Sequence, residues 1–167
     1  IYDISPAMLK AARRHNGVIP NVIVLEKLNQ GSLPVFDYIL VNSVIQYMAP
    51  DKLKENILLW RSLLKNDGKI IISDILPCKL GFVKELWELL SFSLAQGHLI
   101  EQVIQFYTLF FSNYSKAANT SPLNIYTPDI LRTIAAQADL ELEINEKNLS
   151  FSKHRYTACF RKFNDDK

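Results

Sequence analysis

The chain has 167 residues, 49% of them hydrophobic and 22% charged, a composition that supports one globular domain and excludes a wholly disordered chain. Its net charge of +2 argues against a protein that binds nucleic acid through a strong positive field. Two cysteines, Cys78 and Cys159, form no disulfide framework, and charges interrupt the longest apolar stretch, 80–111, so we expect a cytoplasmic protein without a membrane span.

Strand and helix signals alternate over the first 75 residues. A Ser-Pro pair starts the first helix and an Asn-Gly pair ends it, while Pro50 opens the second. This alternation predicts a parallel sheet with right-handed crossovers. The predicted elements are strands over 1–4, 22–25, 36–41 and 69–75, a helix over 5–16 and a helix from 50 to the turn at 66–68.

The second half of the sequence breaks this rhythm. Two helical patterns occupy 79–118, and Thr127 and Pro128 start a further helix that continues to Ala138. The runs 140–144 and 155–163 predict two closing strands that are antiparallel neighbours.

Polar residues follow three of the predicted strands. In an open parallel sheet ligands bind at the carboxyl ends of the strands, which here are marked by Asp3, by Asn42 and Ser43, and by Asp74. An acid in the position of Asp3 can accept hydrogen bonds from both hydroxyls of a nucleoside ribose, or it can cap the helix that begins beside Ser5.

Three segments, in this order, resemble motifs of class I S-adenosylmethionine-dependent methyltransferases. Residues 2–9 resemble the motif that follows the family's glycine-rich loop, and 36–47 resemble its fourth-strand motif. Residues 63–74 resemble its fifth-strand motif, with Asn-Asp-Gly where Pro-Gly-Gly is common. The run 42–47 is especially similar to small-molecule methyltransferases, including the methylation domains of peptide and polyketide assembly lines.

The resemblance implies an α/β fold, a Rossmann-like doubly wound, mostly parallel sheet with a helical insertion after the strand that ends at Asp74. It implies one methyltransferase domain over 1–167, with a helical cap over 79–125. The family's loop of an acid followed by three alternating glycines is missing, because the five glycines are scattered. We therefore expect a fragment that lacks its N-terminal strand and glycine loop.

The resemblance also implies roles for individual residues, with S-adenosylmethionine as the cofactor. Asp3 would bind the ribose hydroxyls and Ile4 would pack on the adenine. Asn29 and Gln30 occupy the positions at which members of the family form a hydrogen bond with the adenine amino group. The remaining positions carried over are Asn42 and Ser43, which would line the methionine part of the cofactor, and Gln46 and Tyr47, which would face the transferred methyl group.

Aromatic residues concentrate in the predicted cap. Eight of the 18 aromatic residues lie within 82–114, among them Phe106 and Phe110. An aromatic cap suits the acceptor pocket and a sulfonium cofactor, through cation–π attraction, but the same residues also suit an ordinary core or a homodimer interface.

Three further side chains are candidates for chemistry. His98, with Glu101 beside it, could take a proton from the acceptor, and Tyr47 could donate a hydrogen bond to it; otherwise His98 is a surface residue and Tyr47 packs under the cap. Asp74 could bind a substrate amine, but one carboxylate makes no metal site.

The sequence therefore predicts methyl transfer from S-adenosylmethionine to an oxygen, nitrogen or carbon of a small metabolite. A methyltransferase-like module that only binds other molecules is the main alternative. A nucleic-acid methyltransferase is disfavoured because 42–45 lacks the Asn/Asp-Pro-Pro-aromatic motif. A nucleotide-binding oxidoreductase would need a glycine fingerprint that is also missing.

Overall fold

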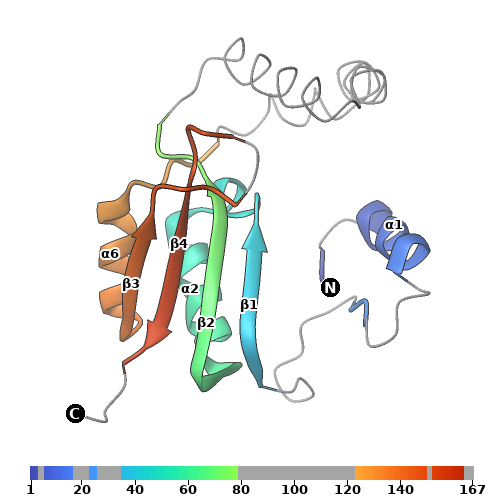
Figure 1. Cartoon of the computed structure of the whole chain (residues 1–167), viewed down its shortest axis with the longest axis horizontal. Coiled ribbons are helices and arrows are strands. Elements are labelled where there is room, and N and C mark those ends of the chain that lie inside the picture. Colours follow the sequence, from blue (N-terminus) through green and yellow to red (C-terminus); the bar gives the residue numbers. More distant parts are fainter. Residues whose placement is uncertain (4–5, 17–22, 26–34, 79–122, 150–151, 164–167) are drawn as a thin grey trace. The chain divides into compact units, whose positions relative to one another are not determined.

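The computed structural model describes residues 1–3, 6–16, 23–25, 35–78, 123–149 and 152–163. It divides into two compact units, Ile1–Val35 and Phe36–Lys167. Figure 1 labels their helices and strands. Most of the predicted cap, 79–122, lies outside the described residues, so the cap and the extent of the domain stay predictions.

The first unit contains helix α1, Pro6–Asn16, and one parallel β-bridge between Tyr2 and Leu25. The Leu25 amide donates to the Ile1 carbonyl at 2.8 Å, and Leu9 of α1 is buried. The predicted helix is confirmed. The described parts of the two predicted strands run parallel but form a single bridge.

The second unit contains a four-stranded sheet in the order β1-β2-β4-β3. Its strands are β1 Phe36–Asn42, β2 Leu64–Ile75, β3 Leu140–Asn145 and β4 Tyr156–Lys162. β1 and β2 are parallel, whereas β4 is antiparallel to both β2 and β3, so the predicted antiparallel closing pair is confirmed. The described sheet is nevertheless mixed, not mostly parallel as predicted, because β4 turns back from β3 and inserts beside β2.

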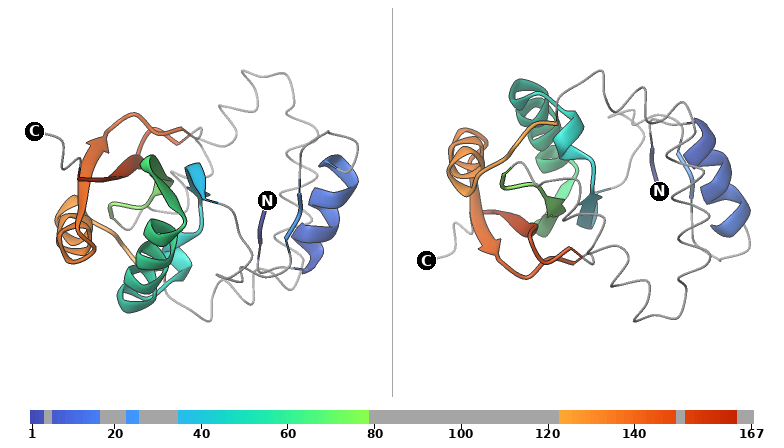
Figure 2. Two further views of the ribbon diagram at one scale, coloured as in Figure 1. Left: turned by 90° about the horizontal axis from the view of Figure 1, so that it is seen from below. Right: turned by 90° about the horizontal axis from the view of Figure 1, so that it is seen from above.

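Two helices, α2 Pro50–Ser62 and α6 Pro128–Gln137, cover one face of this sheet (Figures 1 and 2). Pro50 and Pro128 occupy first-turn positions, where a missing N–H costs nothing, and the Thr127 side chain caps α6 by accepting from the Ile130 amide. Because both described helices of this unit lie on the same face, the doubly wound arrangement is not seen in this part of the chain.

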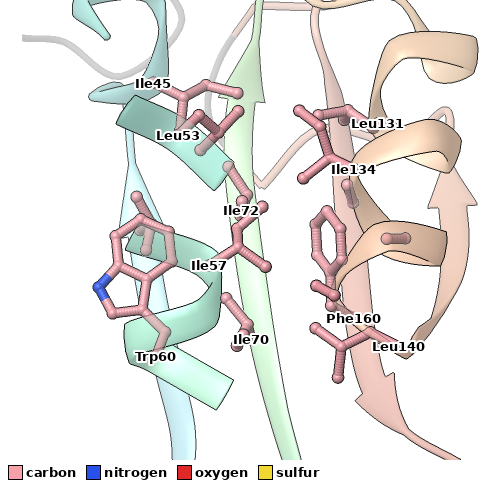
Figure 3. Packing of buried hydrophobic residues seen from close by; sticks show 14 of the residues in the cluster. Ile45, Leu53, Ile57, Trp60, Ile70, Ile72, Leu131, Ile134, Leu140 and Phe160 are labelled. Carbon is pink, nitrogen blue, oxygen red and sulfur yellow. The ribbon is translucent and has the colours of Figure 1, made fainter. Parts of the chain in front are cut away.

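The core lies between this sheet face and the two helices (Figure 3). Apolar side chains at helical spacing on α2 meet alternate residues of β2, while α6 covers β4 and β3. The fully buried members include Leu53, Ile57, Ile70, Ile72, Leu131 and Phe160. On β1, by contrast, Tyr38 and Leu40 are each 64% exposed, although the run 36–41 is nearly all apolar.

Two buried tyrosines connect the core to the loops above it. The Tyr156 hydroxyl donates to the Tyr126 carbonyl at 2.7 Å, and the Tyr126 hydroxyl donates to the Met48 carbonyl at 2.7 Å. Burial raises the pKa of both phenols, because a buried phenolate would lose its hydration. Both groups therefore remain neutral donors well above neutral pH.

Replacing Tyr156 by phenylalanine is expected to weaken the alkaline dependence of stability. Because the pKa is higher in the folded state, the unfolded chain loses this proton first as the pH rises. The contribution is complete below about pH 10 and declines above it, by up to about 1.4 kcal/mol per pH unit. Urea denaturation between about pH 9 and pH 12 measures the two slopes, and equal slopes in the two proteins would contradict the prediction.

Candidate functional site

The carboxyl ends of the parallel strands β1 and β2 lie side by side. Asn42, the last residue of β1, is in register with Ser73 of β2, and the Ser73 hydroxyl donates to Asn42 Oδ1 at 2.7 Å. One residue further on, the Ser43 hydroxyl donates to Asp74 Oδ2 at 2.6 Å. The structure thus brings together three residues that the sequence predicted at this edge, Asn42, Ser43 and Asp74.

The backbone is left-handed at both strand ends. Ser43 has φ 55° and Asp74 has φ 64°, a conformation that non-glycine residues adopt at a cost of about 1–2 kcal/mol. At Asp74 the pairing of β2 with β4 is also irregular between Ile72 and Ile75. The left-handed backbone at Ser43 and Asp74 must therefore be stabilised by surrounding contacts.

Asp74 is the centre of a buried polar cluster. Its side chain is 9% exposed, and its Oδ2 accepts from both Ser43 and the Arg155 guanidinium, the latter at 2.9 Å. Asn148 donates to Asp74 Oδ1 at 3.0 Å and accepts from the Asp74 amide at 3.0 Å. Because both carboxylate oxygens already accept hydrogen bonds from protein side chains, Asp74 has a structural role in the site.

The segment 42–47, called the site loop below, continues from β1 into a short 3-10 helix, Ile45–Tyr47. Gln46 is 4% exposed, and its Nε2 donates to the Ser43 carbonyl at 2.9 Å. Its Oε1 is buried without a hydrogen-bond partner among the described residues. Tyr47 is instead exposed. In the site loop, the Gln46 side-chain oxygen is therefore a buried hydrogen-bond acceptor without a donor among the described residues, and the Tyr47 side chain is exposed.

Both ends of the predicted cap are anchored beside the site loop. Just outside its two ends, the Leu76 carbonyl accepts from the Tyr126 amide at 3.0 Å, and near its C-terminal end the Asn124 amide donates to the Gln46 carbonyl at 2.8 Å. The segment 79–122 therefore leaves and re-enters the described structure next to the carboxyl ends of β1 and β2.

The other predicted site residues lie in the first unit or outside the described residues. Asp3 lies in the first unit and is half-buried. The others lie outside the described residues: Ile4, Asn29, Gln30, His98, Phe106 and Phe110. Conversely, sequence reasoning missed Asn148 and Arg155, which reach Asp74 from 74 and 81 positions away and carry no local signal.

Other kinds of site find little support in the described residues. They contain no group of three or more side chains suited to hold a metal ion. Burial raises the pKa of the Cys159 thiol, so the reactive thiolate is disfavoured there. None of the described helices is long and apolar enough to cross a bilayer.

No family model and no curated protein matches the sequence, whereas many solved structures match the fold. An O-methyltransferase family 2 protein from Planctomyces limnophilus, in complex with apigenin, is 18% identical with a TM-score of 0.57; the match covers 98% of this chain and 43% of that one. Human N-acetylserotonin methyltransferase, in complex with SAM, is 14% identical with a TM-score of 0.57, over 98% of this chain and 40% of that one.

Magnesium protoporphyrin IX methyltransferase from Synechocystis, with bound SAH, is 13% identical with a TM-score of 0.54, over 95% of this chain and 60% of that one. The chain thus spans between 40% and 60% of the length of these three proteins. At such identities the likeness concerns the fold. The chain shares the Rossmann-like α/β fold of these methyltransferases.

Proposed function

We propose that this chain is part of an S-adenosylmethionine-dependent methyltransferase that acts on an oxygen, nitrogen or carbon of a small metabolite. The observation that carries the proposal is the site loop. It places polar side chains at the carboxyl ends of a parallel strand pair, within a fold shared with SAM- and SAH-bound methyltransferases. The small net charge of +2 favours a small acceptor over nucleic acid.

The described residues fit such a cofactor and acceptor. Asn42 is exposed and uses Oδ1 to accept from Ser73, which leaves its amide N–H groups to donate to a carboxylate such as that of the methionine part. Gln46 Oε1 is buried and has no donor among the described residues, and a methyl-acceptor molecule with a hydroxyl or amine would supply one. The exposed Tyr47 side chain follows Gln46 in the site loop and is proposed to contact the methyl-acceptor molecule.

When bound, S-adenosylmethionine supplies an electrophilic methyl group on a sulfonium sulfur. The contribution of the protein is to hold the acceptor atom in line with that methyl group and to keep water away, which alone accounts for a large rate gain. Gln46 would orient the methyl-acceptor molecule by accepting a hydrogen bond from the hydroxyl or amine of that molecule. The segment 79–122, anchored at both ends beside the site loop, is proposed to close over the acceptor.

A second candidate function, a methyltransferase-like module that binds another molecule without catalysis, is favoured by one observation. Tyr38 and Leu40 on β1 are both 64% exposed, although large apolar side chains are usually buried. Titration calorimetry of the full-length protein with S-adenosylmethionine separates the two functions. Saturable binding with one site supports the methyltransferase, and the absence of binding supports the module.

Within the methyltransferase proposal, Asp3→Ala is expected to weaken S-adenosylmethionine binding by more than any other single change in residues 1–75. A carboxylate that accepts from two ribose hydroxyls makes two charge-assisted hydrogen bonds, so we expect a loss of at least about tenfold in affinity. Calorimetry measures it, with Asp51→Ala, an exposed acid in the first turn of α2, as the control. Equal affinities of the two variants would remove Asp3 from the site.

A further inference from the structure

We infer that Arg155 and Asn148 are positioning residues that hold the site loop in shape through Asp74. The inference rests on the proposed function insofar as the site loop is taken to contact the cofactor and acceptor. Neither residue belongs to β1 or β2: Asn148 lies between β3 and β4, and Arg155 directly precedes β4.

On one side of Asp74, the side chains of Arg155 and Asn148 make three hydrogen bonds that restrict the carboxylate and its backbone. The Arg155 side chain, 15% exposed, donates to Oδ2 at 2.9 Å, and Asn148 donates to Oδ1 at 3.0 Å. Asn148 also accepts from the Asp74 amide at 3.0 Å and donates to the Ser152 carbonyl at 3.0 Å. With both oxygens and the amide engaged, the carboxylate has one orientation, which aims Oδ2 at Ser43.

On the other side, Ser43 passes this constraint to the site loop. Its hydroxyl donates to Asp74 Oδ2 at 2.6 Å, within the range of charge-assisted O–H···O⁻ bonds. Its amide donates to the Ser73 carbonyl at 3.2 Å, and its own carbonyl accepts from Gln46 Nε2 at 2.9 Å. A serine adopts the left-handed conformation only where surrounding contacts hold it there. Here those contacts form a continuous series of hydrogen bonds from Arg155 through Asp74 and Ser43 to the side-chain amide of Gln46.

Backbone hydrogen exchange of the unliganded, full-length protein tests this directly. We expect Arg155→Gln to accelerate exchange at residues 43–47 by about tenfold more than exchange in α6, because a charge-assisted bond that orients Asp74 is lost beside the loop. Arg155→Lys keeps a cation and is expected to stay within about twofold of wild type. Arg161→Gln is the matched control, because Arg161 of β4 pairs with Glu143 at an exposed position.

A double-mutant cycle distinguishes positioning of the loop from general stabilisation. Ser43→Gly removes the hydroxyl but tolerates the left-handed backbone, so in that background Arg155→Gln is expected to add less than about twofold to loop exchange. An equal increase in both backgrounds, or an increase in α6 as large as that in the site loop, would overturn the inference. If Arg155→Gln does not fold, Asn148→Ala takes its place in the same cycle, because this variant keeps the ion pair between Arg155 and Asp74. Unchanged hydrogen exchange at residues 43–47 in Asn148→Ala would then overturn the inference.

Calorimetry with S-adenosylhomocysteine separates this inference from the proposed function. If wild type binds, Arg155→Gln is expected to bind about tenfold more weakly, with Arg161→Gln unchanged. A wild type that does not bind, but whose loop exchange responds as expected, contradicts the proposed function and supports the positioning role. Binding by wild type together with loop exchange that Arg155→Gln leaves unchanged overturns the positioning role alone.

Discussion

Asp74→Ala is expected to lower the free energy of unfolding by about 3–5 kcal/mol, because it removes one partner of a largely buried ion pair. The Arg155 side chain is only 15% exposed, and the carboxylate that neutralises it also accepts from Ser43 and Asn148. Their donors would lose an acceptor in the same change. Urea denaturation monitored by circular dichroism measures the loss.

Two further variants show whether the effect comes from the loss of the Asp74–Arg155 ion pair. Asp129→Ala removes an exposed partner of Arg132 and is expected to cost less than about 1 kcal/mol. Asp74→Ala combined with Arg155→Met removes both charges, and we expect it to recover at least about 1 kcal/mol of the loss. A double variant less stable than Asp74→Ala would show that packing around the pair, and not charge, dominates.

Phe160→Ala is expected to cost about 3–5 kcal/mol of stability. Phe160 is fully buried on β4, which lies between β2 and β3, and its register partners are Ile70 and Leu142. Its ring lies near Leu140 and Ile134, as Figure 3 shows, so truncation opens a cavity where sheet and helix meet.

The matched control is Phe163→Ala, a phenylalanine just beyond the end of β4 that is 50% exposed. We expect a change within about 0.5 kcal/mol, because no cavity forms. Thermal or urea unfolding measured on both variants gives the comparison. Similar losses for Phe160→Ala and Phe163→Ala would contradict the packing described for the core.

Local signals in the sequence were sufficient to predict the described helices and the strands of the second unit. Proline at the first turn of α2 and the Thr127–Pro128 pair before α6 act within one turn, so their effect can be read without knowing the fold. Boundaries were less certain: β2 begins at Leu64, five residues before the predicted strand, because pairing with Phe36 extends it across an irregular register. Such pairing depends on a distant strand and leaves no local pattern.

For three of the residues predicted at the site edge, the sequence was sufficient. Asn42, Ser43 and Asp74 come together because parallel neighbours place their carboxyl ends at one edge, a rule that needs only strand order. The same rule says nothing about side-chain burial. Gln46 and Tyr47 are adjacent and both were predicted to face the methyl group, yet one is buried and the other exposed.

Only the tertiary structure decided the place of β4 in the sheet and the partners of Asp74. A hairpin that inserts its second strand beside β2 makes the sheet mixed, and this choice depends on the whole core and not on any one segment. That insertion also brings Asn148 and Arg155 to Asp74 across 74 and 81 positions of the chain. A single asparagine or arginine has no periodicity to reveal its partner, because its hydrogen bonds are specified by position in space and not by spacing in sequence.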